Sequence, residues 1–166
     1  MALVITSPAF THNGAMAIKY TCEDDDVSPA LAWSGVPAGA RSLALIVDDP
    51  DAPDPAAPKR VYVHWVLYDM APTSTGLPEG VKAAAQPNGG RQGMNDGGNV
   101  GYMGPCPPIG RHRYFFKLYA LDAMLGDLGA AATKAQVEAA MRGHILEQAE
   151  LMGTYQGKDG PAKRKR

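Results

Sequence analysis

The sequence predicts a mostly β fold. Three windows have the composition of strands, Ser42–Val47, Val61–Tyr68 and Arg113–Leu121, and a weaker alternation covers Met16–Cys22. Gly and Pro supply 19 and 14 of the 166 residues, which favours a turn-rich fold over a helical bundle or a coiled coil. A chain of 166 residues can bury about 70% of the surface that its unfolded form exposes, and a net charge of −1 does not favour disorder, so we expect a folded domain.

Each window has its own character. Ser42–Val47 is a continuous apolar run, which predicts a strand buried on both faces. Val61–Tyr68 is β-branched and aromatic and predicts a second interior strand. Arg113–Leu121 alternates, with Tyr114 on one face and Phe115 on the other. The Met16–Cys22 window places every second residue on one face and predicts the first strand along the chain.

One helix is predicted near the C-terminus. Thr133 and Gln136 have the spacing of a capping box, in which each side chain bonds the other's backbone N–H. Apolar residues then recur every three or four positions as far as Met152, and Gly153 is a suitable stop. We therefore expect a helix from Thr133 to Met152 against the sheet, followed by a short extended segment at 154–156.

Charge and length define one domain and exclude some functions. The net charge is −1, but four of the 16 basic residues lie in Lys163–Arg166, which leaves an acidic body. A nucleic-acid-binding domain carries a basic stripe on its folded part, so we expect no nucleic-acid partner. No apolar run approaches the ~20 residues of a membrane span, and no signal-peptide core is present. We predict a cytoplasmic domain over 1–157 and a disordered basic tail over 158–166.

The chain has two cysteines, Cys22 and Cys106. Two cysteines do not make a disulfide framework, and the sequence shows no export signal. We therefore expect both to be free thiols in a reducing compartment.

Two long segments are rich in turn residues. Asp49–Lys59 carries four prolines, so its backbone is stiff and unsuited to a sheet interior. Asn88–Gly110 carries eight glycines in 23 residues. Loops of this length are usually functional or disordered, and their prolines favour the functional interpretation.

Three ionisable residues stand beside these loops. Asp49 ends a predicted strand, His64 lies within an apolar strand, and His112 opens the strand that follows the second loop. A single His in a strand is usually a hydrogen-bonded structural residue. Two such His and a strand-end Asp indicate a site if the fold brings them together.

The motifs around these residues are specific in order and spacing. The segments 49–53 (DPDAP), 64–65 (HW) and 104–114 (GPCPPIGRHRY) resemble the phosphatidylethanolamine-binding protein family. The opening segment 6–10 (TSPAF) and the segment 28–33 (SPALAW) are similar to its bacterial Raf-kinase-inhibitor-like branch. The resemblance runs from about Leu3 to Tyr155.

The resemblance implies a β-sandwich of antiparallel sheets with one main C-terminal helix packed at the side, and a small anion pocket at one end. It also implies a homodimer and an inhibited partner such as a kinase or a protease. No catalytic motif is found among the residues, and we expect no cofactor and no metal. We expect Asp51 and Arg113 to brace the site by pairing with each other or with the backbone. The ligand-binding residues that it implies are Asp49, His64, Gly104, Pro105, His112, Tyr114 and, from a weaker motif, Tyr102.

The residue types suit a phosphate ester. A Gly/Pro loop can aim backbone N–H groups at one point, and two imidazoles supply a charge that changes with pH. Asp49 favours the imidazolium forms and repels a dianion, so the best fit is a monoanionic ligand or a zwitterionic one whose ammonium end could meet a carboxylate. We predict that phosphate-type ligands bind more tightly as pH falls through about 6.5, the ordinary imidazole value.

Other interpretations stay open at this point. Asp49, His64 and His112 are also the ligand types of an iron or zinc site, although no two of them share the short spacing of one element. A hydrolase could use either His as a base and Cys106 as a nucleophile, although no Gly-x-Ser-x-Gly motif is present. Inhibition of a partner protein is a third class, for which the sequence offers no contact surface.

Overall fold

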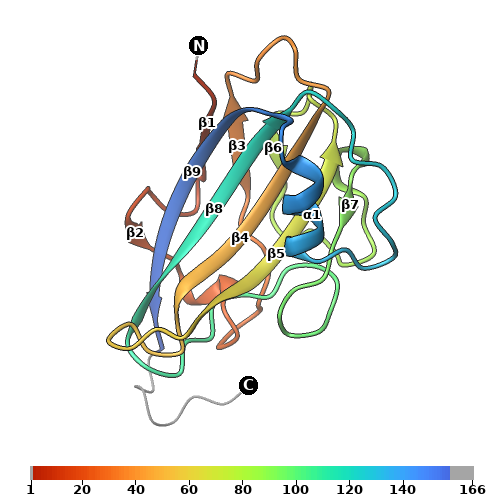
Figure 1. Ribbon diagram of the computed structural model, residues 1–166. Coiled ribbons are helices and arrows are strands. Elements are labelled where there is room, and N and C mark those ends of the chain that lie inside the picture. Colours follow the sequence, from red (N-terminus) through yellow and green to blue (C-terminus); the bar gives the residue numbers. More distant parts are fainter. Residues whose placement is uncertain (1, 158–166) are drawn as a thin grey trace.

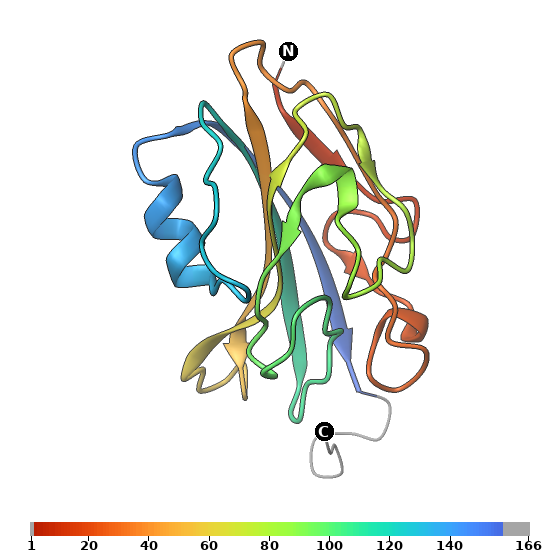
Figure 2. The same ribbon diagram turned by 90° about the vertical axis from the view of Figure 1, so that its right-hand side faces the viewer.

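The computed structural model describes residues 2–157 as two β-sheets and one α-helix in three layers (Figures 1 and 2). The six-stranded sheet lies in the middle, with α1 on one face and the three-stranded sheet on the other. The mostly β fold of two sheets with a helix at the side is therefore confirmed. The predicted tail at 158–166 lies outside the described residues.

The small sheet has the order β1-β3-β6 and the large one β2-β9-β8-β4-β5-β7, antiparallel except for the short β2–β9 pair. Two 3₁₀ turns, Ile18–Tyr20 and Pro87–Gly89, complete the elements. The strands and the helix are β1 (Val4–Thr6), β2 (Gly14–Ala15), β3 (Leu31–Ser34), β4 (Ser42–Ala52), β5 (Arg60–Met70), β6 (Gly76–Leu77), β7 (Arg91–Gln92), β8 (Arg111–Leu121), α1 (Lys134–Met141) and β9 (Ile145–Gln156).

The layers explain why the central strands are apolar on both faces. Leu45 of β4 packs with Trp33 of β3 in the core between the sheets. Its neighbour Ile46 points to the other face and packs with Val137 of α1. A strand covered on both sides buries every residue, so the continuous apolar run at 42–47 was interpreted correctly.

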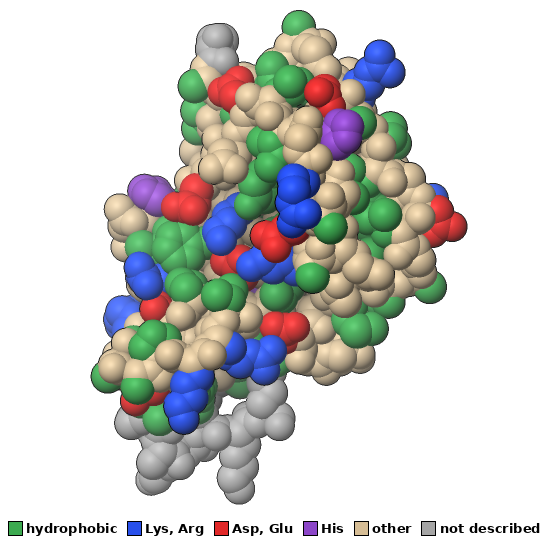
Figure 3. All heavy atoms as spheres, in the orientation of Figure 1, with side chains coloured by type: hydrophobic (Ala, Val, Ile, Leu, Met, Phe, Trp, Pro, Cys, Tyr) green, Lys and Arg blue, Asp and Glu red, His purple; other side chains and the backbone are tan. Residues whose placement is uncertain are grey.

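An ion cluster fixes the start of α1 to the sheet. The carboxylate of Asp48 is buried on β4 and contacts Lys117 Nζ at 3.1 Å and Lys134 Nζ at 2.9 Å. Lys134 is the first residue of α1, and the predicted capping box is present, with Thr133 just before Lys134 and Gln136 two residues after it. On this face Lys and Arg side chains lie among Asp and Glu side chains and form no continuous basic patch (Figure 3).

The predicted long helix is wrong beyond Met141. The chain turns at Gly143, where φ is +84°, a conformation that favours glycine, and 145–156 form β9. β9 pairs with β8 along its length, from Leu121↔Ile145 to Arg111↔Gln156. This long-range pairing overrides the helix-favouring composition of the segment.

Two smaller expectations also need correction. The predicted strand at 16–22 is a 3₁₀ turn, and only Gly14–Ala15 pair as a strand. The proline-rich segment 49–59 is not wholly a loop, because β4 continues to Ala52. Its pairing with β8 ends at Asp48, and its pairing with β5 becomes irregular after Asp49. The strand therefore accepts Pro50 at the end of the sheet.

Candidate functional site

The three motifs meet at one cavity. Asp49 is on β4, His64 on β5 and His112 on β8, and these strands are neighbours in the order β8-β4-β5. The segment 103–108 closes the cavity beside them. The cavity has a volume of about 470 Å³. The lining residues are Asp49, Ala52, Pro53, Lys59, Arg60, Tyr62, His64, Met103, Cys106, Pro107, Pro108, His112 and Tyr114.

Asp49 and His112 form a buried pair at this cavity. His112 Nδ1 lies 2.6 Å from Asp49 Oδ2, and the side chains are only 1% and 4% exposed. His112 Nε2 lies 2.7 Å from the carbonyl oxygen of Ile109. Both neighbours accept hydrogen bonds, so an imidazolium, which donates from both nitrogens, satisfies the geometry. The backbone N–H of Asp51 donates to Asp49 Oδ1 at 2.7 Å, so both carboxylate oxygens have protein partners.

The pKa of His112 reflects two opposing effects. Burial lowers it, because a charged ring loses its hydration. The hydrogen bond and the negative charge of Asp49, helped by the Ile109 carbonyl, act in the opposite direction, and the net pKa lies above the ordinary imidazole value. His112 therefore keeps its proton to a higher pH than a histidine in water.

Asp51 and Arg113 pair beside the cavity, as the sequence predicted. The Arg113 guanidinium donates to the Asp51 carboxylate at 3.0 and 2.9 Å, and the Arg113 backbone N–H donates at 2.9 Å. The side-chain hydrogen bond from Arg113 lowers the pKa of the Asp51 carboxyl. This arrangement holds β4 against the start of β8, next to Asp49 and His112.

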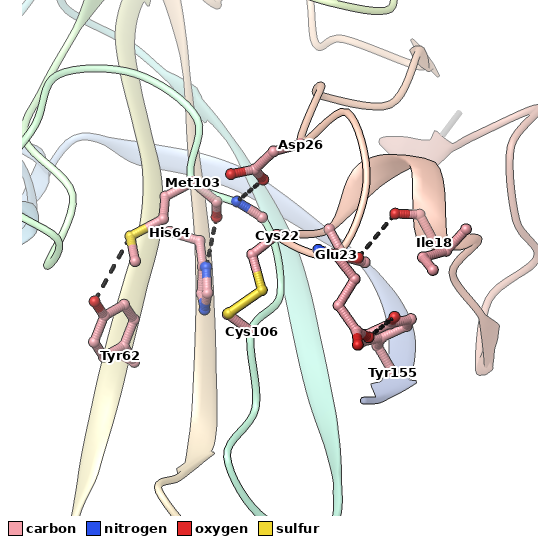
Figure 4. The surroundings of a disulfide bond; sticks show 11 residues. Ile18, Cys22, Glu23, Asp26, Tyr62, His64, Met103, Cys106 and Tyr155 are labelled. Atoms are coloured by element: carbon pink, nitrogen blue, oxygen red, sulfur yellow. Dashed lines mark hydrogen bonds between the residues drawn. A yellow bond between two sulfur atoms is a disulfide. The ribbon is translucent and has the colours of Figure 1, made fainter. Parts of the chain in front are cut away.

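His64 is oriented by Met103 of the glycine-rich segment 88–110. Its Nδ1 lies 2.6 Å from the Met103 carbonyl oxygen, so Nδ1 carries a proton and donates it (Figure 4). The ring stands between two aromatic rings, with centroids 5.1 Å from Tyr62 and 5.2 Å from Tyr114. Its other nitrogen, Nε2, is at the end of the ring away from Met103.

Three of the predicted site residues lie behind the cavity wall. The Gly104 N–H donates to Asp26 Oδ1 at 2.8 Å instead of facing the cavity, and a Cβ at Gly104 would lie 2.2 Å from the Tyr20 carbonyl oxygen. The Pro105 carbonyl accepts from Cys22. Tyr102 donates to the Tyr20 carbonyl at 2.8 Å and lines a separate, more polar hollow. These residues position the loop.

Sequence reasoning missed two basic residues of the lining. Lys59 ends the proline-rich segment and Arg60 begins β5, so both stand at the cavity. The Arg60 guanidinium lies over the Tyr62 ring at 5.0 Å and pairs with Asp96 at 3.0 Å. The signal that could have found them is their position at the end of the proline-rich segment that begins with the DPDAP motif. A lysine and an arginine at a loop end, however, resemble ordinary surface residues.

The cysteines contradict the sequence prediction. Cys22 and Cys106 form a disulfide between residues 84 apart in sequence (Figure 4). The prediction of two free thiols is wrong. The cysteines therefore no longer support a reducing compartment. Cys106 is not a thiolate nucleophile in this state, which leaves the hydrolase interpretation without its candidate residue.

The remaining alternatives gain no support from residues 2–157. No three His, Cys, Asp or Glu side chains in this range are grouped as metal ligands, and His112 and Asp49 use their polar atoms on each other and on the backbone.

Among the helices of residues 2–157, none has both the length and the apolar character needed to cross a membrane.

The fold and the cavity define a class of small two-sheet proteins with a ligand-sized cavity at the end of the larger sheet. The family model described as phosphatidylethanolamine-binding protein matches residues 6–156. This chain belongs to that family, as its motifs predicted.

Relatives and solved structures agree with this assignment. A UPF0098 protein of Methanothermobacter thermautotrophicus is 52% identical over 148 residues, which cover 89% of this chain and 94% of that protein. The crystal structure of a phosphatidylethanolamine-binding protein homolog from Chlamydia trachomatis has a TM-score of 0.84 and 43% identity, covering 95% of this chain and 99% of that chain. Escherichia coli YbcL has the same TM-score at 31% identity, covering 95% and 100%. The similarity to the bacterial branch is thereby confirmed.

Proposed function

We propose that this family member is a binding protein whose cavity takes a phosphate-type anion or a phosphorylated headgroup. The observation that carries the proposal is the charge arrangement of the lining. Lys59 and Arg60 stand at the cavity, and His64 presents an imidazole to it. The acidic residue of the lining, Asp49, is held by His112 and by the backbone.

The arrangement favours a singly charged anion. The imidazolium of His112 and the carboxylate of Asp49 cancel each other, and Asp96 offsets Arg60 in part. Lys59 and, when protonated, His64 then supply the positive charge that faces a ligand. Charge-assisted hydrogen bonds from such groups to phosphate oxygens are roughly twice as strong as neutral ones.

The two histidines of the lining have different roles, because His112 is held in the buried pair and His64 is not. Both nitrogens of His112 face protein acceptors, so this ring holds the floor of the cavity. His64 donates from Nδ1 to the Met103 carbonyl and lines the cavity, so we assign the pH-dependent contact with the ligand to this ring. Binding should therefore strengthen as pH falls.

Asp49 is a poor partner for a ligand ammonium, although its residue type had suggested that role. Its side chain is buried and both oxygens accept from the protein. We therefore expect inorganic phosphate and phosphoethanolamine to bind with affinities within about fivefold, a difference of ~1 kcal/mol.

Calorimetric titration of the full chain with both ligands at about pH 5.5 and about pH 8 tests the proposal, because an imidazole titrates between these values. We expect tighter binding at the lower pH. His64→Gln should weaken binding at least about tenfold at the lower pH, the loss of ~1.4 kcal/mol, and reduce the pH dependence to the part that comes from the second ionisation of the phosphate itself. His144→Gln, at an exposed ion pair with Asp122, is the matched control. Equal affinity of the wild type and the His64 variant at both pH values would contradict the assignment.

Two further predictions concern other protein chains, both from the family resemblance. A homodimer should give twice the chain mass in light scattering after gel filtration. Inhibition of a partner kinase or protease should appear as a dose-dependent loss of that enzyme's activity on addition of the full chain. A monomeric mass contradicts the first prediction, and unchanged activity contradicts the second.

A further inference from the structure

The Cys22–Cys106 disulfide lies in the wall of the cavity. Cys106 is a lining residue, and Cys22 belongs to the turn 20–26, which follows the 3₁₀ turn at 18–20. We propose that the redox state of this disulfide controls ligand binding, with a formed bond giving a cavity of high affinity and reduction giving one of low affinity. The statement about affinity rests on the proposed function, and the statement about the wall does not.

The bond joins two segments that lie far apart in the sequence. The segment 103–109 leads into β8, whereas the turn 20–26 leads to β3 of the other sheet, and Figure 4 shows the disulfide between them. Hydrogen bonds between the same two segments accompany the disulfide: Cys22 N–H to the Pro105 carbonyl at 3.1 Å, Gly104 N–H to Asp26 at 2.8 Å, and Tyr102 to the Tyr20 carbonyl at 2.8 Å.

These hydrogen bonds do not equal a covalent link. A hydrogen bond of this kind exchanges for one with water at small net cost, so a wall held by noncovalent contacts alone opens more often than a cross-linked wall. The wall carries Cys106, Pro107 and Pro108 of the lining, and the Ile109 carbonyl that receives His112. Motion of the wall therefore changes the shape of the cavity. It also weakens the hydrogen bond between His112 and the Ile109 carbonyl.

The disulfide is placed where a reductant can reach it. Both cysteines are half-buried, and Cys106 borders a cavity of about 470 Å³. The acidic run 23–26 stands next to Cys22 and repels a reductant that carries negative charge in addition to its attacking thiolate. An uncharged dithiol is therefore a better reductant here than an anionic monothiol such as glutathione.

The exchange is balanced with a dithiol as co-reactant. One thiolate of the dithiol attacks a sulfur of the Cys22–Cys106 bond, which breaks that bond and forms a mixed disulfide. The second thiol of the reductant then displaces the remaining cysteine. The dithiol leaves as a cyclic disulfide, and its two electrons and two protons end as the thiols of Cys22 and Cys106. An oxidised dithiol of the same class reverses the step.

The consequence for binding follows from pre-organisation. A ligand that meets a fixed wall loses little free energy to ordering, whereas one that must select the closed form from a mobile wall binds more weakly by the fraction closed. A closed fraction of about one tenth in the reduced protein would lower the affinity about tenfold.

The test compares the oxidised full chain, the same chain after dithiothreitol, and the Cys22→Ser/Cys106→Ser double variant. Amide hydrogen exchange is read over 20–26 and 103–109, and inorganic phosphate is titrated by calorimetry. We expect reduction to accelerate exchange in these two segments at least about tenfold, with β4 and β8 still folded and exchanging more slowly than both segments, and to weaken phosphate binding by a similar factor. The double variant should match the reduced protein and ignore dithiothreitol.

Each other outcome identifies what is wrong. If two thiols appear on reduction but exchange and affinity stay the same, the switch is refuted. Loss of protection throughout the sheet would refute it too, because the bond would then support the whole fold. If the oxidised protein binds no phosphate, the proposed function fails, and the exchange measurement still decides whether the bond controls the wall.

Discussion

The pair of Asp49 and His112 predicts a large and pH-dependent loss of stability on substitution of Asp49 by Asn. The two side chains are 4% and 1% exposed, and the atoms Oδ2 and Nδ1 are 2.6 Å apart. Removing one partner of a buried ion pair costs about 3–5 kcal/mol. Asn keeps the shape of Asp and one acceptor, so we expect a loss of about 3 kcal/mol in the free energy of unfolding, or roughly 10 °C in Tm.

The pH dependence has a definite sign. The pKa of His112 is raised in the folded protein, so the pair's contribution is fully present below about 6.5, the unfolded value, and declines as pH rises through the folded pKa. Asp49→Asn removes the main cause of that rise. The difference in unfolding free energy between wild type and variant should therefore be largest near pH 6 and shrink towards about pH 9.

Urea unfolding at several pH values, followed by tryptophan fluorescence, measures this difference. Asp122→Asn is the matched control, because Asp122 and His144 form the same kind of pair at 2.8 Å with side chains 45% and 46% exposed. Exposed pairs contribute less than about 1 kcal/mol, so this variant should stay close to wild type. A loss below about 1 kcal/mol for Asp49→Asn, or one independent of pH, would refute the reasoning.

Three further predictions address other supports of the fold. The Cys22–Cys106 bond closes 84 residues of chain, so Cys22→Ser/Cys106→Ser should lower the free energy of unfolding of the oxidised protein by about 3–5 kcal/mol in urea; a change below about 1 kcal/mol contradicts this. Asp51→Asn should destabilise at neutral pH and the difference should vanish in acid, because Arg113 lowers the pKa of Asp51 and that contribution is lost as pH falls through the folded value; a parallel urea series at each pH decides. Thr133→Ala should lower the free energy of unfolding by about 1 kcal/mol, measured by thermal unfolding. An unchanged Tm would mean that the capping box does not stabilise the fold.

The sequence predicted those elements whose signal is local. The run at 42–47 is apolar because both of its faces are covered, and the capping box at Thr133 depends on residues three apart. β9 was missed because its strand conformation depends on β8, some 30 residues earlier in the chain, while its own residues favour a helix. The disulfide was missed for a similar reason. Only the fold brings the Cα atoms of Cys22 and Cys106 to 5.5 Å.

The candidate site shows the same division. Asp49, His64 and His112 were found because motifs mark them, and neighbouring strands bring them together. The two histidines also bond the backbone carbonyls of Met103 and Ile109, and such partners cannot be predicted from residue types. The exact path of a loop decides whether an N–H faces the cavity, and that path was not readable from glycine and proline counts.

The central claim is that the cavity receives a phosphate group at His64. A crystal structure of the oxidised full chain grown with phosphoethanolamine near pH 6 tests it most directly. The account predicts a phosphate oxygen about 2.8 Å from Nε2 of His64, on the side of the cavity that carries Lys59, with the Asp49–His112 pair intact. Phosphate bound elsewhere, with the cavity lacking it, would contradict the account.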